Sequence, residues 1–240
     1  MNVIVCVKQV PDTAEVKIDP VTNTLVREGV KSIINPFDTY ALEEGLRLRE
    51  RFSGKVTALS MGPPQAVSAL RDALALGVDE AILLSDRALA GSDTLATSYA
   101  LSKAIENIGP YDLIVCGKQT VDGDTGQVGP GIAERLGLPF VGYVRRIEDV
   151  EGGTVTVERM IEEGYETIEA PLPCVISVVK EINAPRLPSL RGLMKAKSAK
   201  IPVWSAADIG AETEKIGLAG SPTVVVRVFT PPRAGRGEML

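Results

Sequence analysis

The hydrophobic pattern of the first 140 residues alternates between short apolar runs and longer amphipathic segments. The runs are rich in valine, isoleucine and leucine and have the length of buried strands, at residues 3–7, 56–60, 80–84 and 113–116. The segments between them carry apolar residues at helical spacing, at residues 40–52, 66–76, 94–108 and 128–136. Strands that alternate with helices of this length predict right-handed βαβ crossovers. The predicted fold class is therefore α/β, with a doubly wound, mostly parallel sheet of the Rossmann-like kind.

Several predicted boundaries carry residues that start or stop secondary structure. Asp93 and Thr94 form a good N-cap pair for the third helix, and Gly77 and Gly137 are natural helix ends. Between the first strand and the first helix, Pro20-Val21-Thr22-Asn23 separates two short apolar–polar runs at 16–19 and 24–27. This spacing predicts a small hairpin.

The pattern changes after Pro139. Residues 141–150 and 154–160 flank Glu151-Gly152-Gly153, which predicts an antiparallel hairpin extension, and residues 173–179 read as another strand. We expect residues 1–205 to form one domain and residues 206–240 to form a C-terminal arm that packs on another subunit. A disordered terminus is an equally good interpretation of the arm's composition.

Composition narrows the range of functions. The 240 residues carry a formal net charge of −5, which opposes a broad nucleic-acid surface, and they include no histidine. Lack of histidine removes the commonest general base and metal ligand, so we expect no acid–base or nucleophilic active site. Cys6, Cys116 and Cys174 lie in separate apolar runs without disulfide or metal spacing. With no signal-peptide pattern and no apolar stretch of membrane-spanning length, we expect a cytoplasmic protein without membrane insertion.

Candidate chemistry gathers at the carboxyl ends of the predicted strands, where open parallel sheets bind ligands. The loops placed there are 7–11, 61–64, 90–94 and 117–127. The last loop contains Gly117, Gly123 and Gly126 and leads into a helix. Glycine lets a backbone approach a ligand closely, and free N–H groups at a helix start favour phosphate oxygens. This loop therefore predicts a bound nucleotide, with Thr125 and Gln127 as further side-chain donors.

Two features weaken the nucleotide prediction. The loop has neither a Walker sequence nor the Gly-x-Gly-x-x-Gly fingerprint. Asp122 and Asp124 would repel a phosphate, and we expect them to form the turn and cap the following helix. A structural turn without a ligand is the alternative.

Sequence motifs spread from residue 3 to about 204 add a family resemblance. They are Val7-Lys8-Gln9-Val10-Pro11-Asp12-Thr13, Asn35-Pro36-Phe37-Asp38, Met61-Gly62-Pro63, Cys116-Gly117-Lys118-Gln119 with Asp122-Gly123-Asp124, and Ala184-Pro185-Arg186-Leu187 through Met194-Lys195-Ala196-Lys197. In this order they resemble the β subunit of electron transfer flavoproteins. The resemblance implies a heterodimer with an α subunit that carries FAD, and a nucleotide in this chain.

The resemblance also assigns residues to roles. It implies that the nucleotide contacts are Cys6, Asn35, Pro36, Phe37, Asp38, Met61, Gly117, Lys118, Gln119, Thr120, Val121, Asp122, Gly123, Asp124, Thr125, Gly126, Gln127 and Val128. The positions of the loops at the sheet edge add Val7, Lys8 and Gly62 to the predicted contacts. The family's partner-recognition segment is matched, within about 160–172, by Tyr165-Glu166-Thr167-Ile168. The same four residues are also typical of a plain strand.

Members of this family hold either a structural AMP or, in the electron-bifurcating type, a second FAD that accepts hydride from NADH. Segments 10–13, 91–97, 220–223 and 229–231 resemble the bifurcating type, so we expect FAD, with AMP as the alternative. Asp93 would cap the helix and leave Thr94 and Thr97, one turn apart, as neutral donors to the flavin. The implied acceptors are an acyl-CoA or other flavin dehydrogenase on one branch and ferredoxin or flavodoxin on the other.

Three rival functions have weaker support. A non-redox nucleotide-binding sensor fits the first 140 residues but leaves the later motifs without a purpose. Nucleic-acid binding would use the basic residues after 185, which the acidic total opposes: Arg186, Arg191, Lys195, Lys197 and Lys200. A hydrolase using Asp122 and Asp124 lacks a metal-ligand set and a nucleophile.

Overall fold

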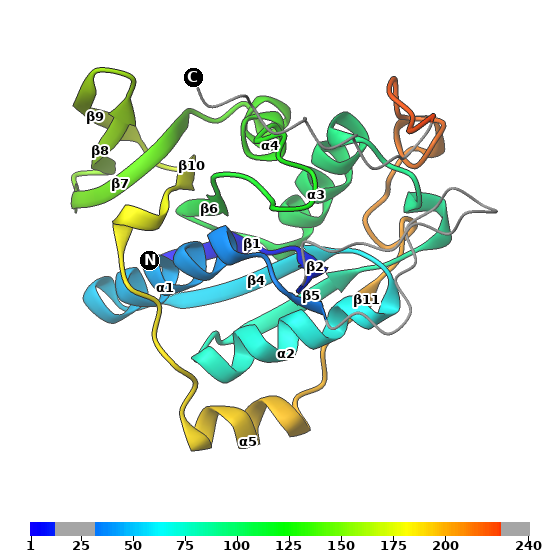
Figure 1. Ribbon diagram of the computed structural model, residues 1–240, viewed down its shortest axis with the longest axis horizontal. Helices are drawn as coiled ribbons and strands as arrows, with labels where there is room; N and C mark the ends of the chain where they lie inside the picture. The colour runs from blue at the N-terminus through cyan, green and yellow to red at the C-terminus, as the bar shows by residue number, and fades with distance from the viewer. Residues whose placement is uncertain (13–31, 227–240) are drawn as a thin grey trace, which may run out of the picture.

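The computed structural model describes residues 1–12 and 32–226. Its centre is a nine-stranded sheet (Figure 1) whose strands follow the order β11 (Val203–Trp204), β5 (Glu80–Leu84), β4 (Lys55–Met61), β1 (Asn2–Cys6), β6 (Leu113–Gly117), β10 (Cys174–Val178), β7 (Phe140–Glu151), β8 (Thr154–Ile161) and β9 (Gly164–Pro171). Neighbouring strands are parallel from β11 to β7, and β8 and β9 add an antiparallel extension. The predicted fold class is confirmed.

Helices cover both faces of this sheet. Helices α1 (Pro36–Phe52) and α2 (Val67–Leu76) pack on one face, and α3 (Thr94–Ile108) and α4 (Val128–Leu136) pack on the other (Figure 1). Side chains alternate along each strand, so Val3 and Val5 of β1 join the first core while Ile4 joins the second. No helix in the described part of the chain is both long and apolar enough to cross a membrane.

The local start and stop signals were predicted correctly. The Asp93 carboxylate accepts hydrogen bonds from the backbone N–H groups of Leu95 (2.9 Å) and Ala96 (3.1 Å) at the start of α3. Gly77 and Gly137 end α2 and α4 in the left-handed conformation, with φ of 118° and 65°. Helix α1 begins at Pro36 rather than at residue 40, because proline at the first helical position needs no N–H partner.

The later part of the chain contains both expected and unexpected elements. The hairpin turning at Gly152 and Gly153 is confirmed as β7 and β8, and the strand expected at 173–179 is β10. The strand interpretation of residues 165–168 is confirmed, since they lie in β9. The prediction missed β11, a small two-stranded sheet of β2 (Gln9–Pro11) and β3 (Ser32–Ile34), helix α5 (Leu190–Ser198), and the 3-10 turns η1 (Pro64–Ala66), η2 (Arg87–Leu89), η3 (Lys180–Ile182) and η4 (Thr213–Lys215). The hairpin expected at 16–27 lies outside the described residues.

The segment expected to form an arm begins by packing on this same domain. Ala206, Ile209 and Ile216 are buried in the core on the α3 side of the sheet. The Tyr99 hydroxyl of α3 accepts a hydrogen bond of 3.1 Å from the Glu212 backbone N–H. Residues 227–240 are outside the described part, so packing of the arm on another subunit stays a prediction.

Candidate functional site

The strand order reverses direction between β1 and β6. From β1 the chain adds β4 and β5 on one side, and it then returns to place β6 on the other side of β1. In doubly wound sheets, ligands bind outside the carboxyl ends of the strands at such a switch point. The segments that leave these two strand ends are the ones that the sequence analysis selected, beginning at Val7 and at Gly117.

A hydrogen-bond network joins three segments at this edge. The Asn35 side-chain amide donates to Asp38 Oδ1 (2.9 Å) and to the Gln119 carbonyl (2.9 Å). The Asn35 Oδ1 atom accepts from the backbone N–H of Val121 at 3.1 Å. The Lys8 backbone N–H donates to Asp38 Oδ2 at 2.7 Å. The loop after β1, the start of α1 and the loop after β6 are therefore held together as one unit, which we call the loop joint.

The loop joint depends on close approach between β6 and α1. A Cβ atom at Gly117 would lie 2.3 Å from Asp38 Oδ1 and 2.8 Å from the carbonyl carbon of Phe37, so a side chain has no room there. Burial raises the pKa of Asp38 to about 7, while hydrogen bonds from Asn35 and from the backbone of Lys8 oppose the rise. Asp38 is thus a buried carboxyl group that links the loops, and its contact with a nucleotide stays a prediction.

The two aspartates of the glycine-rich turn both have donors. Asp122 forms an ion pair of 2.8 Å with Lys8 Nζ, and the Gln119 side-chain amide donates to Asp124. Asp124 adopts a φ of 55°, so the expected role in turn formation is confirmed. The expected helix capping is wrong, because α4 begins after Gln127 with no side-chain cap. Among the described residues, no side chain therefore caps the first N–H groups of α4.

The start of α3 contacts the same turn. Thr94 Oγ1 donates to Gln127 Oε1 at 2.9 Å, so the expectation that Thr94 is free is wrong. Gln127 is distant from Thr94 in sequence, so helix capping alone did not predict this hydrogen bond. The contact holds the start of α3 against the start of α4. Thr97 is half-buried one turn further along α3, where its backbone N–H donates to the Asp93 carbonyl at 2.9 Å.

The C-terminal tail docks on the cap of α3. Asp93 Oδ2 accepts hydrogen bonds from the Thr223 hydroxyl (2.8 Å) and the Thr223 backbone N–H (3.1 Å). The Ser221 hydroxyl accepts from the Asp93 backbone N–H at 2.8 Å. One aspartate therefore orders a helix start and a tail segment together.

The remaining predicted contacts are less closely connected. Cys6 and Met61 are half-buried at the ends of β1 and β4, and Gly62 donates its N–H to the Leu84 carbonyl at 3.0 Å. Pro36 and Phe37 open α1. These residues share the carboxyl edge of the sheet, but the loop joint includes neither Met61 nor Gly62.

The predicted partner-recognition residues lie on β9, the outer strand of the antiparallel extension. The Tyr165 ring is exposed and stacks under the Arg145 guanidinium, 4.0 Å from the ring centroid. Glu166 pairs with Arg159 across the hairpin. The structure does not bring these residues to the loop joint.

A second exposed apolar surface was not singled out by the sequence analysis. Leu187, Leu190 and Met194 are 88%, 79% and 72% exposed on and just before α5. The available signal was the spacing of Leu190, Leu193 and Met194 on one helix face with no obvious partner. The rival interpretation of this region as a nucleic-acid surface loses support, because Arg186 pairs with Glu43 (2.8 Å) and Glu50.

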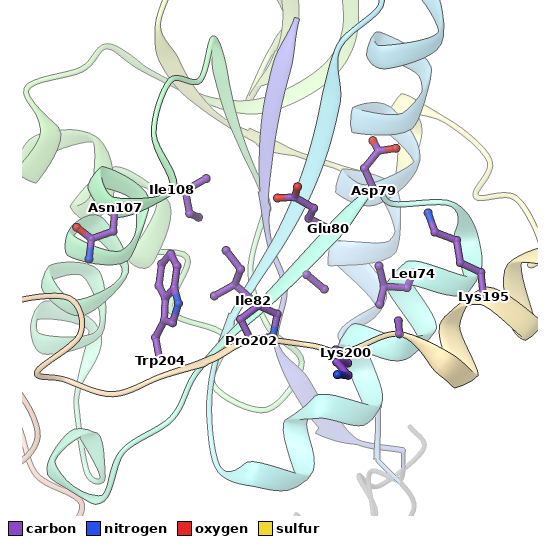
Figure 2. A pocket seen from close by; sticks show the side chains of 12 residues that line it. Leu74, Asp79, Glu80, Ile82, Asn107, Ile108, Lys195, Lys200, Pro202 and Trp204 are labelled. Carbon is purple, nitrogen blue, oxygen red and sulfur yellow. The ribbon is translucent and has the colours of Figure 1, made fainter.

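A pocket of about 380 Å³ lies beside the amino-terminal half of β5 (Figure 2). It is lined by apolar groups such as Ile82 and Trp204, and its acidic groups are already paired, Asp79 with Arg49 and Glu80 with Lys55. It contains none of the predicted site residues. In the described ranges, no cluster of three or more cysteine, aspartate or glutamate side chains could hold a metal ion.

The fold and the loop joint define a doubly wound α/β protein whose switch point is built from a glycine-rich turn. Residues 22–209 match the family model described as electron transfer flavoprotein domain. The chain therefore belongs to the electron transfer flavoprotein family.

Three similar proteins give the scale of this relationship. The chain is 55% identical over 240 residues to the electron transfer flavoprotein subunit beta of Thermoanaerobacterium thermosaccharolyticum, covering 100% of this chain and 92% of the relative. It is 52% identical over 247 residues to protein FixA of Azotobacter vinelandii, covering 100% and 88%. It is 51% identical over 241 residues to the caffeyl-CoA reductase-Etf complex subunit CarD of Acetobacterium woodii, covering 100% and 92%.

Proposed function

We propose that this chain is the nucleotide-binding β subunit of an electron transfer flavoprotein and carries electrons together with an α subunit. The observation that carries the proposal is the loop joint at the switch point, where Lys8, Asn35, Asp38 and Gln119 fix the edge that binds ligands in this class of fold. Family membership supports the same conclusion.

The donors at this edge suit a dinucleotide. The first N–H groups of α4 have no side-chain cap and can bind phosphate oxygens. The repulsion expected from Asp122 and Asp124 is reduced, because Lys8 and Gln119 already contact these carboxylates. The phosphates would therefore bind at the turn and the α4 start, with ribose and base against the ends of β1 and β4.

We propose FAD rather than AMP as this nucleotide. Two of the segments that resemble the bifurcating type, 91–97 and 220–223, contact each other through Asp93, Ser221 and Thr223. The contact between these two segments supports the proposal that they act together and hold the start of α3 beside the glycine-rich turn. AMP is the second candidate, favoured by the same phosphate donors, which do not distinguish the two nucleotides.

The protein's contribution to electron transfer would be binding, orientation and exclusion of competing acid–base chemistry. A bound FAD supplies hydride acceptance and one-electron transfer. The loop joint would fix the distance between the nucleotide and the sheet, and the start of α3 would present the Thr97 side chain to the flavin ring. The described donors are mostly neutral, which suits tuning of a flavin's potential without a catalytic base.

The proposed electron transfer requires several protein partners. An α subunit would contact the part of the arm, residues 206–240, that does not pack on this domain as Ala206, Ile209 and Ile216 do. NADH, an acyl-CoA dehydrogenase and ferredoxin or flavodoxin would exchange electrons with the complex. Tyr165 to Ile168 are one candidate for dehydrogenase recognition, with Tyr165 as an amphipathic anchor. The exposed apolar side chains of α5 are another, because uncovered leucines and methionines at helical spacing are typical of docking surfaces. Alanine substitution of Tyr165 or of Leu190, followed by reduction assays with the dehydrogenase, would separate these surfaces.

Nucleotide counting tests the central proposal. The chain would be purified with its α subunit, the nucleotides released with acid, and FAD and AMP counted per heterodimer. Two FAD support the bifurcating type, and one FAD with one AMP refutes it while keeping the nucleotide site. Gly123→Tyr, which places a ring over the turn, should remove one nucleotide, whereas Gly123→Ala should retain it because the nearest atom to a Cβ there is 3.4 Å away. Equal nucleotide content in both variants would refute the site.

A further inference from the structure

Two thiol groups lie side by side at the switch point. Cys6 and Cys116 are paired in register at the carboxyl ends of β1 and β6, and both side chains face the core beneath α3 and α4. Adjacent strands lie about 4.8 Å apart, which is within the Cα separation of about 4.4–6.8 Å that a disulfide spans. Parallel neighbours also direct their Cβ atoms to the same face. The geometry for a cross-strand bond is therefore present.

The two thiols differ in access. Cys6 is half-buried, whereas Cys116 is only 6% exposed and lies beneath Gly129. The contact with Cys6 and burial together raise the pKa of the Cys116 thiol. An external reagent would thus reach Cys6 first, and Cys116 would react as its buried neighbour.

The third cysteine provides an internal contrast. Cys174 lies on β10, where it pairs in register with Leu113, and its side chain belongs to the core on the opposite face of the sheet. Burial raises the pKa of its thiol to about 11. Cys174 is therefore isolated from the other two thiols.

We propose that Cys6 and Cys116 form a reversible dithiol–disulfide pair at the floor of the nucleotide site. The bond itself follows from the strand geometry alone. Its effect on the nucleotide rests on the proposed function, because it requires the ligand to lie over the ends of β1 and β6.

A small-molecule disulfide, such as oxidised glutathione, is a sufficient oxidant. The Cys6 thiolate attacks one of its sulfurs, which forms a mixed disulfide and releases one thiol. Cys116 then loses its proton to solvent and attacks the Cys6 sulfur, which closes the protein disulfide and releases the second thiol. Two protein thiols are oxidised and the reagent is reduced to two thiols. The raised pKa of Cys116 makes closure the slower step.

Closure would act on the loop joint through the chain that follows Cys6. The bond draws the Cys6 side chain toward β6, and Lys8, two residues later, donates its N–H to Asp38. Any shift of Lys8 weakens that hydrogen bond and the fixed spacing of the loops. We expect the oxidised protein to bind its nucleotide about tenfold more weakly, which is the effect of losing one buried hydrogen bond.

The test uses the purified heterodimer, first reduced and then exposed to oxidised glutathione. Peptide mass spectrometry after alkylation would follow the wild type and Cys6→Ser, Cys116→Ser and Cys174→Ser. The wild type and Cys174→Ser should gain a Cys6–Cys116 bridge that dithiothreitol reverses. Cys116→Ser should stop at a mixed disulfide on Cys6, and Cys6→Ser should retain two free thiols.

Three outcomes would overturn the pair: unchanged thiols in the wild type, a mixed disulfide on Cys6 that never closes, or a bridge that includes Cys174. A separate measurement distinguishes this failure from failure of the proposed function. Bound nucleotide should slow oxidation of Cys6 severalfold relative to protein stripped of nucleotide. Equal rates would refute the placement of the nucleotide over β1 while leaving the disulfide chemistry intact.

Discussion

Replacing Gly117 with alanine is the sharpest test of the loop joint. The added methyl group would lie 2.3 Å from Asp38 Oδ1 and 2.9 Å from the Asp38 backbone nitrogen, both far inside van der Waals contact. Relief to an ordinary contact of about 3.4 Å requires the end of β6 and the start of α1 to separate by about 1 Å. That movement also lengthens the hydrogen bond of 2.7 Å from the Lys8 N–H to Asp38.

The size of the effect follows from these two contributions. Overpacking of a tight core contact costs about 1–3 kcal/mol, and weakening a buried hydrogen bond adds about 1 kcal/mol. For a chain of this size we therefore expect Gly117→Ala to lower the thermal midpoint by about 5–10 °C. Thermal unfolding of the purified heterodimer at one protein concentration measures this shift, and acid release measures the accompanying loss of nucleotide.

Gly123→Ala is the matched control, because it adds the same methyl group to the same turn. The nearest atom to a Cβ at Gly123 is Thr120 Oγ1 at 3.4 Å, which is ordinary contact. Its thermal midpoint should stay within about 1–2 °C of the wild type. If Gly117→Ala behaves like this control, the close approach of β6 to α1 does not hold the joint together, and the argument built on it fails.

Three further predictions concern charged side chains. Because burial raises the pKa of Asp38 from 3.8 to about 7, the folded protein keeps a proton that the unfolded chain loses, so the free energy of unfolding falls as pH rises from 4 to 7. Across that range, the difference in free energy of unfolding in urea between the wild type and Asp38→Asn should change by about 3 kcal/mol, and a constant difference contradicts this. Asp93→Ala should cost about 1–2 kcal/mol through the lost α3 cap and should speed proteolysis near Thr223; an unchanged cleavage rate contradicts tail docking. Arg186→Ala should cost about 1–3 kcal/mol in urea unfolding by leaving buried Glu43 underpaired, and a neutral result contradicts this.

The local features of the fold were predictable because neighbouring residues determine them. The Asp93 cap, the Gly77 and Gly137 helix ends and the turn at Gly152 each depend on residues within one turn of chain. Gly117, at the end of β6, likewise predicted that another group approaches the backbone closely. The identity of the approaching group, the Asp38 carboxyl at the start of α1, depends on tertiary packing that sequence spacing does not encode.

The errors at the site have the same physical origin. Thr94 was expected to be free because Asp93 caps the helix, yet Gln127 from another loop accepts a hydrogen bond from its hydroxyl. Asp122 was expected to form a cap, yet the Lys8 ammonium lies 2.8 Å away and pairs with it. Helix α5 and the exposed Leu190 were missed because the helix is short and its packing on α2, through Ala196, depends on tertiary contacts.

The position of β10 has a consequence for synthesis and assembly of the chain. Strand β10, at Cys174–Val178, lies between β6 and β7, so β7 has no parallel neighbour until the ribosome has released residues beyond 178. The hairpin of β7, β8 and β9 can form early from local contacts, but its docking must await that late strand. A nascent chain stalled before Cys174 would expose the hydrophobic edge of β6, a state in which sheet proteins aggregate or recruit chaperones.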